Sequence, residues 1–226
     1  MIQPKTSQVE VPLSVRRWVQ QFERTVYKSE ELDKLTAQCT EEGAALLFLR
    51  LDQARELLRA TRTLREKLVI RYFLLNGLAP TELSLARLEG LDPVNCTLFL
   101  PKRHWKKNCL ADIDPETVKL QIIYAGNRVE GPLIQGRQGG LKFNWLNRTV
   151  HKVADRTCIA RKERVSPIVL KRTFAREWLL SGGGVGTLQK QFSHKHLWST
   201  AHYLRFIMED VKPEHRRMVR KVLEEA

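Results

Sequence analysis

The sequence predicts a mainly α-helical domain with a small antiparallel β-sheet. Apolar residues recur at helical spacing along most of the chain, and two short β-prone runs flank a basic turn near its middle. The length of 226 residues and the hydrophobic content of 42% are sufficient for one ordinary core with a small appendage. We therefore expect one main domain preceded by a short extension.

Residues 1–45 form the predicted N-terminal extension. The first residues are polar and include Pro4, so no regular structure is expected there. From Leu13 onward apolar residues recur at helical spacing, and a second short helical stretch is predicted from Ser29 to Cys39. Acidic residues offset the basic ones within the extension, so the excess positive charge lies downstream of it.

The middle of the chain supplies the predicted centre of the domain. Gly77 is a C-terminal stop for one helix, and Pro80 opens the next, since a missing N–H is harmless at the first helical position. The expected elements are helices at 52–60 and 64–75, a helix from Pro80, strands at 97–100 and 109–113, and a helix at 115–124.

The last part of the chain is predicted to be helical throughout. The expected helices lie at 143–154, 166–180, 188–192, 199–208 and 213–225. The glycine run 182–184 separates two of them as a turn or hinge. A phosphate-binding loop is the alternative interpretation of this run, but the Lys-Ser/Thr ending of such loops is missing.

The formal net charge of +14 is far from neutral for a chain of this size. Such a surface attracts polyanions and raises their rate of encounter, so nucleic acid is the leading partner class. Contact with anionic lipid, or a basic surface without a polyanionic partner, is the alternative. Basic clusters lie at 102–107, 161–164 and 171–172, and such distant segments can converge on one surface after folding.

The four cysteines, Cys39, Cys96, Cys109 and Cys158, form no close pair of the kind that binds zinc or performs redox chemistry. We expect free, mostly packed thiols in a reduced, cytoplasmic compartment, and neither a metal nor a cofactor. No apolar run approaches the roughly 20 residues that span a bilayer, and the N-terminus lacks a signal-peptide core. No membrane association is expected.

Four segments carry the most specific information. Residues 74–83 read LLNGLAPTEL, 169–175 read VLKRTFA, 192–195 read FSHK and 199–203 read STAHY. In order, they resemble the three active-site boxes and the nucleophile segment of the tyrosine recombinases, the phage integrase family. His194 follows Lys171 by 23 positions and Tyr203 follows His194 by 9, as in the family pattern. The resemblance covers residues 46–210 and implies the family's catalytic-domain fold.

The resemblance assigns chemical roles to three residues. Tyr203 takes the position of the nucleophile, which attacks a phosphodiester and forms a 3'-phosphotyrosyl bond. His194 takes the place of the third-box donor to the scissile phosphate, and Lys102 that of the general acid in the turn between two strands. Lys106 and Lys107 compete with Lys102 for this role. A packed tyrosine, an exposed histidine and simple phosphate-contacting lysines are the alternative interpretations.

Three positions depart from the family pattern. Ala79 stands where the first box has a phosphate-clamping arginine, Ile168 replaces the second-box histidine, and Lys171 replaces the second arginine. Alanine and isoleucine supply no donor, and lysine lacks the planar fork that grips two phosphate oxygens. Arg172 and Arg87 are the nearby candidates for a substitute cation. This pattern indicates impaired strand cleavage.

The expected partner is double-stranded DNA, with a nucleoid location when bound, together with a second copy or a partner recombinase. The extension is too short for the separate core-binding domain that family members carry. The predicted C-terminal helix, 211–226, resembles one that family members pack onto a neighbouring protomer, although packing on its own domain is an equal alternative. The predicted DNA-contacting residues are Lys102, Arg103, Lys106, Lys107, Arg161, Arg164, Lys171, Arg172 and Lys195.

Three functions are compatible with the sequence. The first is a DNA-binding member of the family that is impaired in cleavage and serves as a site-binding regulator or accessory factor. The second is a divergent site-specific recombinase that uses Tyr203, His194 and Lys102. The third is a protein-interaction module, for which the near-neutral extension is the sole support.

Overall fold

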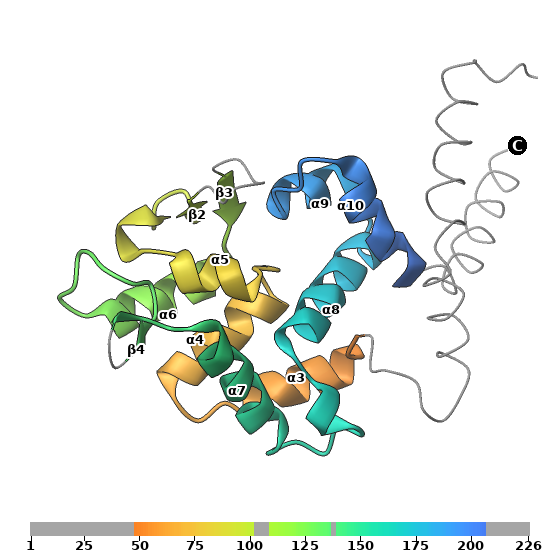
Figure 1. Cartoon of the computed structure of the whole chain (residues 1–226), viewed down its shortest axis with the longest axis horizontal. Helices are drawn as coiled ribbons and strands as arrows, with labels where there is room; N and C mark the ends of the chain where they lie inside the picture. The colour runs from red at the N-terminus through yellow and green to blue at the C-terminus, as the bar shows by residue number, and fades with distance from the viewer. Residues whose placement is uncertain (1–47, 102–108, 137–138, 207–226) are drawn as a thin grey trace, which may run out of the picture. The chain divides into compact units, whose positions relative to one another are not determined.

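The computed structural model describes residues 48–101, 109–136 and 139–206, coloured in Figure 1. The chain divides into two units, Met1–Ala45 and Leu46–Ala226, and all described residues belong to the second. The helices expected within the extension and at 213–225 therefore lie outside the described residues.

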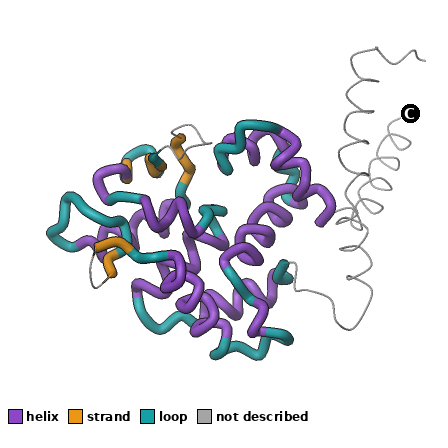
Figure 2. Tube along the Cα trace, viewed as in Figure 1, coloured by secondary structure: helices purple, strands orange, loops and turns teal. Residues whose placement is uncertain are grey.

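Helices dominate the described part of the chain, with short strands between them (Figure 2). The α-helices are α3 (Leu51–Arg59), α4 (Leu64–Leu74), α5 (Pro80–Leu85), α6 (Pro115–Ala125), α7 (Phe143–Ala154), α8 (Pro167–Leu180), α9 (Val185–Gln191) and α10 (Leu197–Ala201). The 3-10 helices are η1 (Leu88–Gly90), η2 (Lys162–Arg164) and η3 (His202–Phe206). The predicted mainly α-helical class with a small antiparallel sheet is confirmed.

The main sheet has the order β1-β2-β3 and is antiparallel throughout. Its strands are β1 (Leu91–Asp92), β2 (Thr97–Leu100) and β3 (Cys109–Asp112), and a separate hairpin joins β4 (Gln135–Gly136) to β5 (Gly139–Gly140). The sequence predicted β2 and β3. It did not predict β1, β4 and β5, because strands of two residues are too short for an alternating pattern.

Local signals explain most helix starts. The Thr63 side chain accepts a hydrogen bond from the backbone N–H of Glu66 at the start of α4, and Asp114 accepts one from Thr117 at the start of α6. Proline occupies the first turn of α5, α6 and α8. Two boundaries differ from expectation. Helix α9 begins at Val185 instead of Leu188, and the helix expected at 199–208 is divided into α10 and η3.

Helix α4 is the centre of the main core. It packs against α3, α6, α7 and α8, and its residues Leu68, Ile70 and Phe73 are fully buried (Figure 1). A second, smaller cluster of buried residues contains Ala175, Leu188, Phe192 and Tyr203, and Phe174 and Trp178 pack against it. The division into two clusters separates the bulk of the fold from the segment that carries Tyr203.

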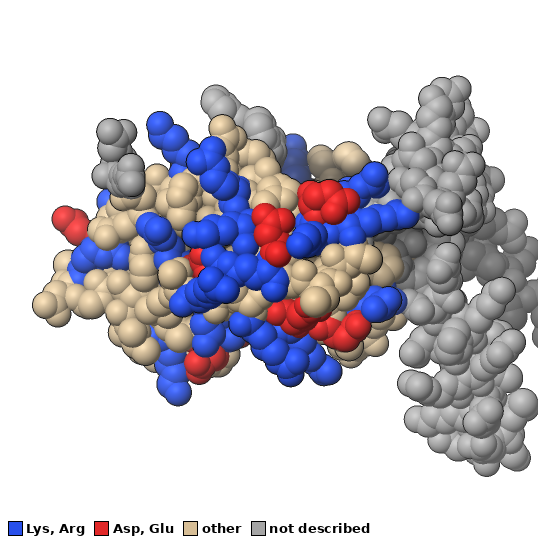
Figure 3. Space-filling model, turned by 90° about the horizontal axis from the view of Figure 1, so that it is seen from below, with Lys and Arg blue, Asp and Glu red and all other residues tan. Residues whose placement is uncertain are grey.

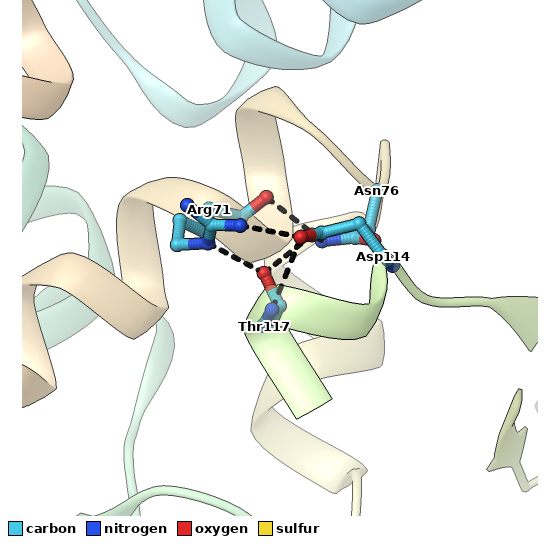
Figure 4. A network of polar contacts seen from close by, with 4 residues as sticks. All are labelled: Arg71, Asn76, Asp114 and Thr117. Atoms are coloured by element: carbon cyan, nitrogen blue, oxygen red, sulfur yellow. Dashed lines mark hydrogen bonds and ion pairs between the residues drawn. The ribbon is translucent and has the colours of Figure 1, made fainter. Parts of the chain in front are cut away.

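A polar network joins α4 to the start of α6 (Figure 4). Arg71 of α4 pairs with Asp114 and donates a 2.7 Å hydrogen bond to the Thr117 hydroxyl. Asn76 accepts a 2.7 Å bond from the backbone N–H of Asp114 and donates one of 3.2 Å to its carboxylate. Because Asp114 lies two residues after the end of β3, this network fixes the end of the sheet to the segment that leads into α5.

No helix within the described ranges has the length and apolar character needed to cross a membrane. The prediction of mostly packed thiols is wrong for Cys158, which is exposed, whereas Cys96 is half-buried. Cys158 is exposed because it lies in the loop after α7 and not on a buried helix face.

Candidate active site around Phe192

The ring of Phe192 brings three predicted site residues together. The Lys171 Nζ lies 4.0 Å from the centre of the Phe192 ring. The ring centres of His194 and Tyr203 lie 5.3 Å and 5.2 Å from that of Phe192. These side chains come from α8, the loop after α9, and η3. We call Lys171, Phe192, His194 and Tyr203 the Phe192 cluster.

Tyr203 lies on η3 and is 8% exposed. Its ring is nearly parallel to that of His194, with 6.4 Å between the ring centres and 16° between the planes. Helix α8 packs directly against η3. The side chain is therefore held within an aromatic layer at the edge of the domain instead of extending into solvent.

Backbone geometry and one hydroxyl orient His194. Ser193 has a φ of 52°, in the left-handed region, so the chain turns sharply between Phe192 and His194. The His194 Nδ1 lies 2.8 Å from the hydroxyl of the buried Thr200. Gln189 donates a 3.0 Å hydrogen bond to the His194 carbonyl. These contacts fix the plane of the imidazole beside Tyr203.

Lys171 is a buried cation with a buried counter-charge. Its side chain is 5% exposed, and its Nζ lies 3.7 Å from Glu82 Oε2. The same oxygen accepts a 2.6 Å hydrogen bond from the backbone N–H of Ala79. Glu82 thus joins the first box to the second, a role that the sequence analysis did not assign. The signal was the Thr-Glu-Leu sequence just after Pro80, which places Glu82 in the first turn of α5.

The two apolar departures lie at helix starts. Ala79 is the residue immediately before α5, and Ile168 lies in the first turn of α8 and is 47% exposed. The backbone N–H groups at the start of a helix have no partner within the helix, so they are available to donate near both positions. The side chains of Ala79 and Ile168 are apolar and supply no donor. The side-chain cation that the structure brings to Phe192 is therefore the one from Lys171.

Arg172 is half-buried on α8, the helix that packs against η3. Burial lowers the pKa of its guanidinium, and the interaction with Tyr203 acts in the opposite direction. Such a group remains charged at every physiological pH. To substitute for the second-box arginine, this side chain must turn inward, and its half-buried position beside Tyr203 is compatible with that.

Gln191 connects three segments around the cluster, although sequence reasoning did not single it out. Its amide donates to the carbonyls of Asn76 and Asp112, at 3.0 Å and 2.9 Å, and accepts a 3.0 Å bond from the N–H of Asp112. It therefore ties α9 to β3 and to the first box. A glutamine at the end of a short helix resembles a surface residue in sequence, so no signal indicated this role.

The remaining predicted DNA-contacting residues are dispersed. Lys195 is exposed next to His194, and Arg161 and Arg164 are exposed in the segment before α8. Lys102, Arg103, Lys106 and Lys107 lie outside the described residues, in the connection between β2 and β3. Within the described ranges, no group of three or more His, Cys, Asp or Glu side chains is arranged to hold a metal ion.

The chain resembles known proteins both in sequence and in fold. No family model matches the chain. The chain is similar to the tyrosine recombinase XerA of Saccharolobus solfataricus, with 26% identity over 164 residues, which cover 72% of this chain and 53% of that protein. The chain thus spans about half the length of the curated relative that it matches.

Several solved structures share the fold. A crystal structure of XerA recombinase superimposes with a TM-score of 0.68 and 17% identity, covering 91% of this chain and 83% of that one. XerH recombinase, bound to its difH substrate in a pre-cleavage complex, gives 0.61 and 16%, over 74% of this chain and 52% of that one. The Tn1549 transposon integrase in complex with transposon right-end DNA gives 0.61 and 14%, over 80% and 68%.

The sequence similarity and the shared fold agree with the order and spacing of the four motifs. Together they show that this chain has the catalytic-domain fold of the tyrosine recombinases and integrases and resembles a tyrosine recombinase in sequence.

Proposed function

We propose that the chain binds double-stranded DNA, that its strand cleavage is impaired, and that it serves as a site-binding regulator or accessory factor. The observation that carries this proposal is the placement of Lys171. The ammonium at the second-box arginine position is buried between Glu82 and the ring of Phe192. A cation already engaged by a buried carboxylate is poorly presented to a phosphate. The net charge of +14, and the DNA in the XerH and Tn1549 complexes, support DNA as the partner.

The missing donors determine how much cleavage would be lost. Attack on a phosphodiester builds negative charge on the phosphoryl oxygens, and side-chain donors stabilise that charge. Removing a single donor of this type costs on the order of 10²- to 10³-fold in rate. Ala79 and Ile168 supply none, and Lys171 supplies a point charge in place of a bidentate fork. The combined losses would remove most of the activity.

A divergent recombinase is the second candidate, and one observation favours it. The Phe192 cluster holds Lys171, His194 and Tyr203 together, and Arg172 follows Lys171 directly in α8. In this reaction the Tyr203 hydroxyl would release its proton to solvent as its oxygen forms a bond to phosphorus, and the bond from phosphorus to the 5'-oxygen would break. The leaving oxygen would take a proton from the general acid, for which Lys102 remains the prediction. His194 would donate to the phosphate through Nε2, since Thr200 engages Nδ1.

The domain boundaries and the assembly belong to the same proposal. Residues 46–210 would form the catalytic-type domain, 1–45 a helical extension, and 211–226 a C-terminal helix that contacts a second copy or a partner recombinase.

Covalent trapping separates the two candidates. The full chain is incubated with nicked duplexes from its own genetic neighbourhood and denatured, and DNA attached to protein is measured beside a native gel. Bound duplex without an adduct supports the impaired DNA-binding protein. An adduct that disappears in Tyr203→Phe supports the divergent recombinase. Absence of duplex binding at low salt would leave the protein-interaction module as the function.

A second variant tests directly whether the lysine at position 171 limits cleavage. Lys171→Arg restores a planar fork at the second-box position, while Lys195→Arg changes an exposed neighbour of His194 in the same way. If the lost fork limits cleavage, adduct formation rises in Lys171→Arg and not in Lys195→Arg. Equal adduct levels in both variants would contradict a limiting role for Lys171.

A further inference from the structure

Positive charge by itself does not orient a bound phosphate. Lys and Arg gather in a broad band across the face of the molecule that Figure 3 views from below. Such a band attracts a polyanion with little dependence on its orientation, whereas a directional hydrogen-bond donor fixes a phosphate oxygen in place. Within the Phe192 cluster, the direction in which His194 can donate depends on its contact with Thr200.

Thr200 is a fully buried residue of α10. This helix contacts both α9 and η3, and Figure 1 shows α9 and α10 side by side. The exposed fraction of Thr200 is 0%, so its hydroxyl is closed off from water. Within the described part of the chain, the Thr200 side chain makes one hydrogen bond, which joins its hydroxyl to His194 Nδ1 at 2.8 Å.

Other buried threonines place their hydroxyl hydrogen on a backbone carbonyl. The hydroxyls of Thr149 and Thr173 each donate a 2.9 Å bond to the carbonyl four residues earlier in the helix. Thr200 differs, since its described side-chain partner is the imidazole. A buried hydroxyl hydrogen without an acceptor is disfavoured by about 5- to 150-fold at equilibrium. The Thr200 hydrogen is therefore directed to Nδ1 of His194.

The direction of this bond determines the tautomer of the histidine. A ring nitrogen that accepts a hydrogen bond carries no hydrogen, so the proton of the neutral imidazole lies on Nε2. We propose that Thr200 is a positioning residue, which donates to Nδ1 and holds His194 as a neutral donor protonated at Nε2. Because Nδ1 is engaged and Nε2 already carries a proton, His194 cannot take the proton of Tyr203. It serves the site as a donor and not as a base.

The surroundings of His194 leave this choice to Thr200. The Gln189 carbonyl accepts a 3.1 Å bond from the His194 N–H, and the Gln189 amide donates a 3.0 Å bond to the His194 carbonyl. The backbone is thus held on both sides. The Phe192 ring meets the imidazole edge to face, with 61° between the planes, and such a contact does not tell one ring nitrogen from the other. A half-turn of the imidazole would place a carbon at the Thr200 hydroxyl, so the hydroxyl selects one orientation.

The inference deepens the proposed function, and it rests on that function for the phosphate contact alone. The tautomer is a property of the chain without DNA. When DNA is bound, the Nε2–H of His194 would donate to one phosphate oxygen, at a site where Ala79 and Ile168 supply no donor. The retained donor would help to orient the phosphate even if cleavage is impaired.

Nitrogen NMR of the full chain without DNA tests the tautomer directly. The two ring nitrogens of a neutral imidazole have well-separated shifts, and their correlations with the ring C–H protons show which nitrogen is protonated. The chain has 6 histidines, and the signals of His194 are those lost in His194→Gln. Slightly above neutral pH, the proton should lie on Nε2. A proton on Nδ1, or on both nitrogens, would overturn the proposal.

Variants at Thr200 test the positioning role. Thr200→Val nearly keeps the shape of the side chain and removes the hydroxyl, so the share of His194 protonated at Nδ1 should rise about fivefold or more. Thr200→Ser retains the hydroxyl and should restore the original balance. Thr149→Val removes a buried hydroxyl of α7, outside the cluster, and is the matched control that should leave the His194 signals unchanged. An unchanged balance in Thr200→Val would overturn the role of Thr200. If Thr200→Val does not fold, the tautomer in the unmodified chain and in Thr200→Ser decides the matter.

Binding of a random-sequence duplex tests the use of the Nε2–H. A glutamine amide reaches about as far as Nε2, and an asparagine amide about as far as Nδ1. His194→Asn should therefore weaken binding at least about fivefold more than His194→Gln does. Equal losses in the two variants would overturn the phosphate contact and leave the tautomer standing. Absence of duplex binding by the unmodified chain at low salt would overturn the proposed function, and the NMR result would still decide the tautomer.

Discussion

The main core and the Phe192 cluster differ in how they are built. The main core is centred on aliphatic residues of α4, such as Leu68 and Ile70, and is covered by α3, α6, α7 and α8. The Phe192 cluster consists of tilted aromatic rings, a buried lysine and a histidine near the end of the described chain. Regions with few packed neighbours open more readily than the global fold. We therefore expect the candidate site residues to lie on the less firmly held part of the domain.

Two residues connect these regions. Gly77 has a φ of 66°, and a Cβ at this position would lie 2.5–2.7 Å from atoms of Phe174 and Phe192. Gln191 bonds to the segments that carry Asn76 and Asp112. The cluster thus depends on close backbone approach and on one amide, whereas the main core depends on extensive apolar burial.

The largest expected effect comes from the same truncation made in both regions. Phe73→Ala in the main core should lower the free energy of unfolding by about 3–5 kcal/mol, measured by urea denaturation. Phe192→Ala should lower the free energy of local opening from α9 to η3, measured by hydrogen exchange, and affect global unfolding less. Equal losses of global stability in both variants would show that the cluster and the core unfold as one unit.

A methyl group added at Gly77, which connects the main core to the Phe192 cluster, should have the next largest effect on stability. Gly77→Ala combines a left-handed backbone, at about 1–2 kcal/mol, with overpacking against Phe174 and Phe192, at about 1–3 kcal/mol, so the loss should be about 2–5 kcal/mol. Gly186→Ala is the matched control, because it lies in α9 with open space at its Cβ and an ordinary φ. The prediction is wrong if both variants have the same thermal stability.

Acid should lower the free energy of unfolding, because protonation of Glu66 removes its ion pair with Arg156 beside the main core. Its pKa is about 2, lowered mainly by hydrogen bonds from Arg156 relative to the ordinary value of 4.5. The stabilisation is therefore complete above pH 4.5 and is lost as the pH falls toward 2. Urea midpoints measured across this range should decline in the unmodified chain. In Arg156→Met the decline over the same range should be smaller, and an identical pH profile would exclude this pair as its cause.

The smallest effect is expected at Ser193, within the turn of the Phe192 cluster. Ser193 adopts a φ of 52°, and its buried hydroxyl oxygen has no hydrogen-bond partner among the described residues. Ser193→Gly should relieve both costs and stabilise the fold by up to about 1 kcal/mol, net of the added freedom of the unfolded chain. Ser193→Ala removes only the hydroxyl and should gain less. A melting temperature that falls in Ser193→Gly would contradict a strained turn.

The sequence predicted most of the fold from the periodicity of its apolar residues and from residues that mark helix boundaries. Pro80 and Gly77 indicated where one helix begins and another ends, and the structure has boundaries at or near both residues. It misplaced the start of α9, because Val185 and Gly186 follow a glycine run and carry little helical signal. It merged α10 with η3, since the apolar spacing of 3-10 and α-helix is nearly the same over a few residues.

The order and spacing of short motifs by themselves predicted the fold class and singled out Tyr203, His194 and Lys171 as candidate site residues, because such patterns are properties of the chain. Only the tertiary structure decided that Lys171 is buried on Glu82, that Gln191 ties the boxes together, and that Arg65 of α4 lies over the Trp145 ring of α7. The reason is physical. Burial, ion pairing and surface charge depend on side chains that lie far apart in sequence, and local periodicity carries no information about which of them meet.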